Sequence, residues 1–292
     1  MKLLVYGAGV CGSLFAARMH EAGHEVSLLA RGERLAALRR HGVRLAEEDG
    51  PVVRRVPVPV VEHPESAYDL ITVLVRAHQV DAVLDSLAGV RGDVLFLLNW
   101  AGGPEPLGAV LGRERVLLGF PMTGGTMDGD VIRHRRSGFL TRRVPIPIGE
   151  PDGRGTPRLT RTVETLRAAG MNAGAEPRMD AWLRTHAAFE VPLGQAVHAA
   201  GGPVALADDP DAIRAMLRLM RQNLAAMDTP PVPRGFAALR TAPQGLLVAV
   251  FRRFLKSPTA VYSGLDDSSP ASTAELERLA EQLRASTRAR VA

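Results

Sequence analysis

Cysteine and lysine are scarce in this sequence, and long apolar runs are absent. Cys11 is the one cysteine among 292 residues, so the chain cannot form an internal disulfide. No Cys/His cluster has the spacing of a zinc site, and we expect no metal. No apolar run reaches the length that crosses a bilayer, and no basic segment precedes a long apolar stretch at the N-terminus. These absences predict a soluble, cytoplasmic protein.

Positive charge comes almost wholly from arginine. The lysines are Lys2 and Lys256, although the chain carries 36 basic residues and a net charge of +5. The basic residues are interleaved with acidic ones and form no aromatic-bearing stripe, so we expect no nucleic-acid partner. We expect a small-molecule substrate and no membrane partner, and the apolar helices of the C-terminal half leave a homodimer open.

The N-terminal residues have the pattern of a strand, a glycine turn and a helix. Residues 3–6 are apolar, residues 13–19 have helical spacing, and a second apolar run at 25–30 follows at the distance that a βαβ unit needs. Residues 7–12 between strand and helix have the spacing GxGxxG. This context predicts a dinucleotide-binding turn, with the helix N-terminus facing the phosphates.

Each glycine of this turn has its own role. Gly7 permits the tight turn, Gly9 lets backbone N–H groups approach a pyrophosphate, and Gly12 lets helix and strand pack closely. An acid at the end of the second apolar run would bind the ribose hydroxyls of NAD, whereas Arg31 stands there and predicts a 2′-phosphate, hence NADP(H). The cofactor-binding residues predicted in this segment are Gly7, Ala8, Gly9, Val10, Cys11, Gly12 and Arg31.

Two further strands place polar residues at the same edge of the predicted sheet. Residues 69–75 are almost continuously apolar and predict a buried parallel strand followed by Arg76, and residues 93–98 predict the next, followed by Asn99. Ligands of open α/β sheets bind outside the carboxyl ends of the strands. We therefore expect Arg31, Arg76 and Asn99 at one crevice.

The predicted fold is an α/β N-terminal Rossmann domain, doubly wound with a mainly parallel sheet, followed by an all-α C-terminal domain. The composition changes near residue 170, and we place an NADP-binding domain at 1–172 and a helical domain for substrate binding or dimerisation at 173–292. Further strands are expected at 116–120, 131–134 and 144–149, with an edge or irregular strand at 52–61. Helices are expected at 34–40, from 78 or 79 to 87, at 157–169, 179–200, 209–227, roughly 233–240, 243–254 and 272–290, the last with a capping box from Ser272 to Glu275.

The sequence resembles the ketopantoate reductases in the glycine turn, the ending Leu28–Arg31, residues 73–80 and residues 97–103. The resemblance covers the N-terminal domain well and the helical domain in outline. It implies NADPH-dependent reduction of a 2-keto acid to a 2-hydroxy acid in a cleft between the two domains. It also implies that Arg76, Gln79 and Asn99 border the nicotinamide, which adds them to the cofactor-binding residues.

The second domain departs from the pattern of that family. The position of the family's helical lysine falls on Arg184, its two asparagine positions fall on Ala188 and Pro192, and its glutamate position falls on Thr259. The segment that touches substrate in the family corresponds to residues 246–251, which have no hydrogen-bonding side chain. The groups expected to bind a small polar hydroxy acid are therefore missing.

The lost lysine leaves the proton donor to be found. Hydride reduction of a carbonyl puts negative charge on oxygen, which must be stabilised and then protonated. Arginine keeps its proton at any working pH, so Arg184 or Arg76 can polarise an oxygen but can hardly donate a proton.

A histidine and a glutamate on the first long helix of the second domain are the leading candidates. His186 and Glu190 are four residues apart and share a helix face, and histidine suits proton transfer near neutral pH. The competing interpretation is a plain packing or surface pair, and Lys256 and Tyr262 are the alternative acids. The predicted catalytic residues are His186, Asn99, Glu190 and Arg184.

The sequence thus favours an NADPH-dependent oxidoreductase that acts on a carbonyl or imine substrate less polar than ketopantoate. The first alternative is an NADP-binding sensor or non-redox protein on the same fold, since the lysine and glutamate are absent. The second is a true 2-dehydropantoate 2-reductase with compensating side chains.

Overall fold

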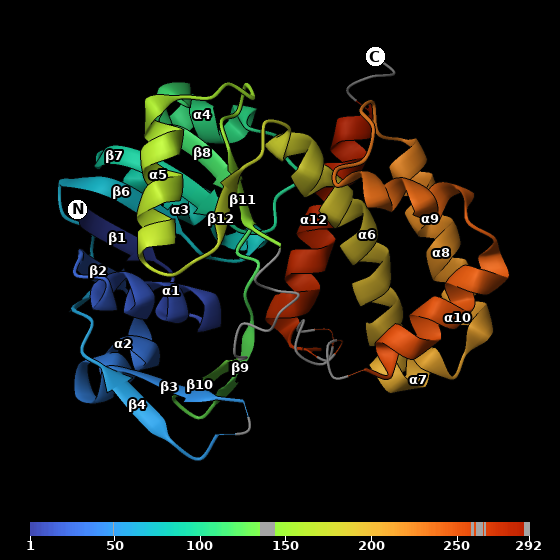
Figure 1. Ribbon diagram of the computed structural model, residues 1–292, viewed down its shortest axis with the longest axis horizontal. Coiled ribbons are helices and arrows are strands. Elements are labelled where there is room, and N and C mark those ends of the chain that lie inside the picture. Colours follow the sequence, from blue (N-terminus) through green and yellow to red (C-terminus); the bar gives the residue numbers. More distant parts are fainter. Residues whose placement is uncertain (49, 135–143, 258–259, 261–264, 266, 289–292) are drawn as a thin grey trace. The chain divides into compact units, whose positions relative to one another are not determined.

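The computed structural model describes residues 1–292 except 49, 135–143, 258–259, 261–264, 266 and 289–292. The chain forms two compact units, one of residues 1–98 and 104–179 and the other of residues 99–103 and 180–292. The first unit is α/β and the second is helical (Figure 1), which is the fold class that the sequence predicts.

An eight-stranded sheet forms the centre of the first unit, in the order β12-β11-β8-β7-β6-β1-β2-β5. Its neighbouring strands are parallel, except that β11 runs antiparallel to β8. The inner strands β1, β6 and β7 end in runs of buried apolar residues, as expected where helices cover both faces of a sheet. The strands are β1 (Lys2–Tyr6), β2 (Glu25–Leu29), β5 (Val60–Val61), β6 (Ala67–Val73), β7 (Arg91–Leu97), β8 (Val116–Gly119), β11 (Ile146–Gly149) and β12 (Ala173–Ala175).

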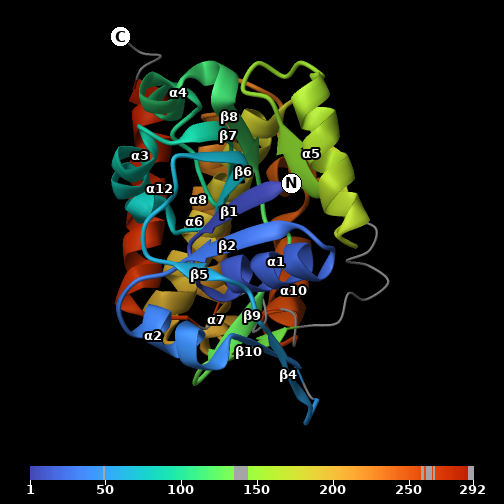
Figure 2. The ribbon, with the colours of Figure 1, turned by 90° about the vertical axis from the view of Figure 1, so that its left-hand side faces the viewer.

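Helices cover both faces of this sheet. Figure 2 shows α1 (Val10–Glu21) and α5 (Pro157–Ala168) on one side, and α3 (Val80–Leu87) and α4 (Glu105–Leu111) on the other. The helix α2 (Gly32–His41) follows β2, and short 3-10 turns, η1 (Ala77–Gln79) and η2 (Arg113–Arg115), precede α3 and β8.

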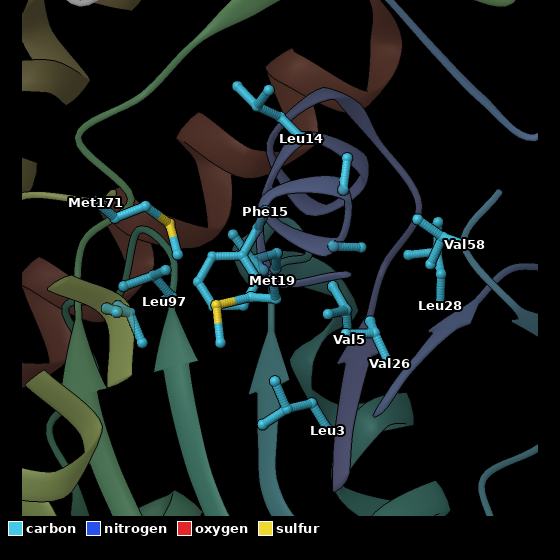
Figure 3. Packing of buried hydrophobic residues seen from close by; sticks show 14 of the residues in the cluster. Leu3, Val5, Leu14, Phe15, Met19, Val26, Leu28, Val58, Leu97 and Met171 are labelled. Carbon is cyan, nitrogen blue, oxygen red and sulfur yellow. The ribbon is translucent and has the colours of Figure 1, made fainter. Parts of the chain in front are cut away.

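The main core of the first unit lies between α1 and the sheet. Figure 3 shows Phe15 and Met19 of α1 between Leu97 and Met171 on one side and Val5 on the other. Because these side chains come from segments far apart in the sequence, their burial anchors α1, and with it the preceding glycine turn, to the sheet.

A small four-stranded sheet, in the order β4-β3-β10-β9, was not expected from the sequence. It consists of β3 (Val43–Glu47), β4 (Val53–Val56), β9 (Gly125–Asp128) and β10 (Val131–His134). The parallel partners β3 and β10 are far apart in the chain, and periodicity in a short window does not report such pairing. The edge or irregular strand expected at 52–61 is confirmed as two short pieces, with β4 at the edge of the small sheet and β5 at the edge of the large one.

Among its described residues, the second unit contains the helices predicted from the sequence and also α7. Its elements are α6 (Met179–Ala200), α7 (Pro203–Ala207), α8 (Pro210–Ala225), η3 (Arg234–Ala237), α9 (Ala238–Thr241), α10 (Gln244–Leu255) and α12 (Pro270–Arg288). The capping box predicted at Ser272 is wrong, because α12 begins at Pro270 and the Ser269 hydroxyl accepts from the N–H of Ser272 at 3.3 Å. An N-cap one turn earlier satisfies the amides that the helix start leaves open.

Pro192 lies inside α6 without ending the helix. Proline has no N–H to donate to the carbonyl one turn earlier, which is that of Ala188. The side-chain amide of Asn223 on α8 lies 3.5 Å from this carbonyl oxygen and supplies a donor. The proline and Ala188 thus have structural roles at the two positions where the resembling family carries asparagine.

The two units divide after Met179, seven residues beyond the boundary placed at 172/173. The reason is β12, which pairs with β11 and so belongs to the large sheet. Among the described residues, no helix is both long and apolar enough to cross a membrane.

Candidate functional site

The glycine turn joins β1 to α1 and has the geometry that its sequence predicts. Gly7 has a φ of +112°, and a Cβ there would lie 2.3 Å from the carbonyl oxygen of Leu74. A Cβ on Gly12 would lie 1.8 Å from the carbonyl oxygen of Gly7. Both positions therefore require glycine on backbone grounds.

Gly9 differs from the other two glycines because nothing lies within 4 Å of the position that its Cβ would take. It is the N-cap of α1 and makes no side-chain cap hydrogen bond, and no acidic residue stands in the first turn. The positive end of the helix dipole at this N-terminus favours an anion. The turn therefore fits a pyrophosphate, with space at Gly9 for its close approach.

Arg31 lies two residues beyond the carboxyl end of β2 and is fixed by an aromatic side chain. Its Nη2 donates to the hydroxyl of Tyr6 at 2.8 Å, and its guanidinium lies 5.9 Å from the centre of the Tyr6 ring. Tyr6, the last residue of β1, is 5% exposed, whereas Arg31 is exposed. The pair holds a cation at the solvent side of the strand ends.

A second arginine, Arg34, supports the glycine turn from α2. Its Nε donates to the carbonyl oxygen of Ala8 at 3.0 Å, and its Nη2 donates to the Ser13 hydroxyl at 3.2 Å. The Ser13 hydroxyl itself donates to the same Ala8 oxygen at 3.0 Å. Burial lowers the pKa of Arg34, with Asp130 partly offsetting it. Sequence reasoning missed this residue, although its place one helical turn after Arg31 was a usable signal.

The segment after β6 holds Arg76, His78 and Gln79. The side-chain oxygen of Gln79 accepts from the N–H of Arg76 at 3.0 Å, which fixes the turn at the carboxyl end of the strand. Nδ1 of His78 is buried and has no hydrogen-bond partner among the described residues. Burial lowers the pKa of His78, and the charge of Arg76 lowers it further, so the neutral imidazole is favoured.

The second unit brings three predicted catalytic residues together. Nδ2 of Asn99 donates to Glu190 Oε1 at 3.1 Å, and His186 Nε2 lies 3.0 Å from Glu190 Oε2. The His186 ring stacks on Trp182 at a centroid distance of 5.3 Å and an interplanar angle of 17°. We call Asn99, Glu190, His186 and Trp182 the α6 cluster. Its carboxylate accepts a hydrogen bond from the amide through one oxygen and lies beside the imidazole through the other.

Asn99 reaches this cluster because the segment 99–103 belongs to the second unit, although it directly follows the end of β7. The indole N–H of Trp100 donates to the carbonyl oxygen of Gly103 at 2.6 Å, and Trp100 is 3% exposed. The side-chain oxygen of Gln282 on α12 accepts from the N–H of Ala101 at 2.9 Å. Gln282 is a residue that sequence reasoning missed, since nothing local relates it to a segment so distant in the chain.

The remaining candidates lie apart from the α6 cluster. Arg184 forms an ion pair with Asp180 at 3.0 Å, one turn earlier on the same helix. The ammonium group of Lys256 lies 2.6 Å from Asp208 on an exposed part of the surface. The alternative acid Tyr262 and the family's glutamate position, residue 259, lie outside the described residues.

The apolar segment 246–251 lies on α10. Leu247, Val248 and Phe251 are buried in the core of the second unit, whereas Leu246 and Val250 are exposed. The segment thus offers hydrocarbon and no polar side chain on either face.

Comparisons with known proteins agree with this architecture. Residues 3–142 match the family model described as Ketopantoate reductase PanE/ApbA. A 2-dehydropantoate 2-reductase of Mesorhizobium japonicum is 28% identical over 211 residues, which are 63% of this chain and 63% of that relative. The chain therefore aligns with less than two thirds of the length of that relative.

Solved structures resemble the chain over nearly its whole length. The 2-dehydropantoate 2-reductase of Geobacter metallireducens has a TM-score of 0.72 at 16% identity, covering 98% of this chain and 100% of that one. A D-mandelate dehydrogenase in a ternary structure with NADH and anilino(oxo)acetate has a TM-score of 0.69 at 16% identity, covering 98% and 99%. At such identities the likeness shows a shared fold.

Proposed function

We propose that this chain, whose residues 3–142 match the ketopantoate reductase family model, is an NADPH-dependent oxidoreductase for a carbonyl or imine substrate less polar than ketopantoate. One observation carries the proposal. The glycine turn keeps the backbone geometry of a dinucleotide site, while the segment expected to contact substrate, residues 246–251, is wholly apolar.

The residues of the first unit fit the cofactor. The uncapped amides at the start of α1 would hold the pyrophosphate, and Arg31 would hold a 2′-phosphate with charge-assisted hydrogen bonds. Arg76 and Gln79 follow the carboxyl end of β6, the edge at which such sheets bind their ligands. Asn99 directly follows β7 in the chain, although it belongs to the second unit. NADPH supplies a hydride when it is bound.

The α6 cluster fits the other half of the reaction. A carboxylate that contacts an imidazole fixes the orientation of its ring, so Glu190 would position His186 for proton transfer. The same carboxylate fixes the Asn99 amide nitrogen, so the amide oxygen points elsewhere. His186 is the proposed proton donor, and Glu190 and Asn99 are its proposed partners.

The proposed activity is tested by NADPH consumption, followed at the near-ultraviolet band of the reduced cofactor, with keto acids, ketones and imines. We expect turnover of an apolar substrate and little with ketopantoate. Turnover of ketopantoate at an ordinary enzymatic rate would show a true 2-dehydropantoate 2-reductase instead.

The role of His186 is tested separately. We expect His186→Ala to slow turnover about a hundredfold and to leave the Kd for NADPH nearly unchanged. His198→Ala is the control. His198 lies on the same helix but outside the α6 cluster, and its Nε2 contacts the backbone oxygen of Asp267 at 2.9 Å. An unchanged rate in the His186 variant would remove this residue from the mechanism.

A second candidate function is an NADP-binding sensor or non-redox protein. It is favoured by the lack of any lysine between Lys2 and Lys256, since the resembling enzymes use a lysine on α6. Tight NADPH binding without NADPH consumption across the whole panel would establish this function.

A further inference from the structure

The fixed charge that the described contacts give the α6 cluster is negative. Its fixed charge is the carboxylate of Glu190, with a side chain 28% exposed, beside His186 at 23%. Among the described contacts of Glu190, His186 alone can carry a positive charge. The nearby guanidinium of Arg184 is paired with Asp180.

One oxygen of this carboxylate is poorly satisfied. Oε1 accepts from the Asn99 amide, whereas Oε2 is buried and receives no well-directed hydrogen bond from the described residues, although His186 Nε2 lies 3.0 Å away. A buried carboxylate oxygen in this state is a strong acceptor for an N–H group.

The sign of the charge that develops on the substrate distinguishes the two substrate classes of the proposed function. Hydride addition to a ketone makes an oxyanion, which a neighbouring carboxylate destabilises. Protonation of an imine makes an iminium cation, which the same carboxylate stabilises. The carboxylate of Glu190 in the α6 cluster thus disfavours reduction of a ketone and favours reduction of an imine.

The acid strength of the His186 imidazolium also favours an imine substrate. An imidazolium is a weak acid, and an imine nitrogen is a far stronger base than a ketone oxygen. Proton transfer from a histidine to an imine before the hydride arrives is therefore favourable, and no lysine is needed.

Resting on the proposed function, we infer that the substrate is an imine with apolar substituents, and that Glu190 binds its protonated nitrogen. In the balanced reaction, the imine nitrogen takes one proton through His186. The carbon takes one hydride from NADPH, the C=N π bond becomes a lone pair on nitrogen, and the products are a secondary amine and NADP⁺. The proton of His186 is replaced from water.

Ligand binding tests this inference without turnover. The bicycles 1,2,3,4-tetrahydroisoquinoline, cationic at neutral pH, and isochroman, its neutral oxygen analogue, have nearly the same shape. Binding is read from tryptophan fluorescence, because one of the two tryptophans stacks on His186. We expect the wild type to prefer the amine by about tenfold or more, the range of a hydrogen bond to a charged group.

Glu190→Gln keeps the shape and the contact to Asn99 while removing the charge, so we expect it to abolish the preference for the amine. Glu277→Gln, at an exposed position of α12, is the matched control and should retain it. A thermal melt of each variant checks that it is folded. A wild type without preference for the amine, or a folded Glu190→Gln that keeps the preference, overturns the assignment.

Turnover separates this inference from the proposed function. We compare 3,4-dihydroisoquinoline with 1-tetralone, the ketone of matching shape. We expect NADPH consumption with the imine, and a drop in kcat/KM of about tenfold to a hundredfold in Glu190→Gln. Turnover of the ketone alone overturns the imine assignment and leaves the oxidoreductase standing. No NADPH consumption with any substrate overturns the proposed function, and the amine-binding comparison then decides the inference alone.

Discussion

At the scale of single residues, Arg31 and Tyr6 offer a direct test of nucleotide choice. The guanidinium is held by a hydroxyl at 2.8 Å and lies against the face of the same ring. An arginine held in this way loses less side-chain entropy when it binds a phosphate. Selectivity for NADPH would then depend on both residues.

We expect Arg31→Ala to weaken NADPH binding about tenfold to a hundredfold, the range of charge-assisted hydrogen bonds, and NADH binding much less. Tyr6→Phe keeps the ring and should weaken NADPH binding only a few-fold. Dissociation constants from titration of both nucleotides check this. Equal weakening of NADPH and NADH in the Arg31 variant would contradict a 2′-phosphate site.

At the scale of elements, the turn between β1 and α1 separates structural glycines from functional ones. Gly12 and Gly9 are three residues apart, yet a Cβ on the first would collide with backbone and a Cβ on the second would meet nothing within 4 Å. The same substitution should therefore act on stability at one position and on binding at the other.

We expect Gly12→Ala to lower the melting temperature by several degrees or to prevent folding, because the Gly7 carbonyl cannot move aside without breaking the turn. Gly9→Ala should melt like the wild type and bind NADPH about tenfold more weakly, since the methyl group would occupy the space for the pyrophosphate. Thermal melts and nucleotide titrations measure the two effects. A Gly9 variant with unchanged affinity would place the phosphates elsewhere.

Elements with strong local signals were predictable from the sequence. The predicted helix 179–200 has the same bounds as α6, and the His186–Glu190 contact follows from helical spacing alone. The small sheet was missed because its parallel strands β3 and β10 pair across distant parts of the chain. For the same reason sequence reasoning placed Asn99 at a strand end but found neither its contact with Glu190 nor the support from Gln282.

At the scale of the whole molecule, stability should depend on histidine titration. Burial lowers the pKa of His78 and of His24 in the folded protein, so the unfolded chain binds protons more readily at these positions. Stability therefore rises with pH in this range, and the contribution of these histidines is lost as the pH falls from the unfolded value of about 6.5 through the lowered pKa of the folded protein.

We expect the melting temperature to fall by a few degrees from pH 7.5 to pH 5.5, because the pKa values of two histidines are lowered in the folded protein. His78→Asn should reduce this dependence, whereas a change at His63, an exposed residue, should leave it intact. Thermal melts across this pH range provide the measurement. A His78 variant with the wild-type pH profile would show that the titration lies elsewhere.

The five residues 99–103 have a consequence for dissecting the chain. They directly follow a strand of the first unit and yet form part of the second. There the N–H of Ala101 donates to Gln282, and the amide of Asn99 donates to Glu190. A fragment that starts at residue 180 would lack them, leaving the carboxylate of Glu190 without its amide donor. No single cut of the chain therefore yields the helical unit with all of its residues, and dividing the chain once cannot give the two units as two intact pieces.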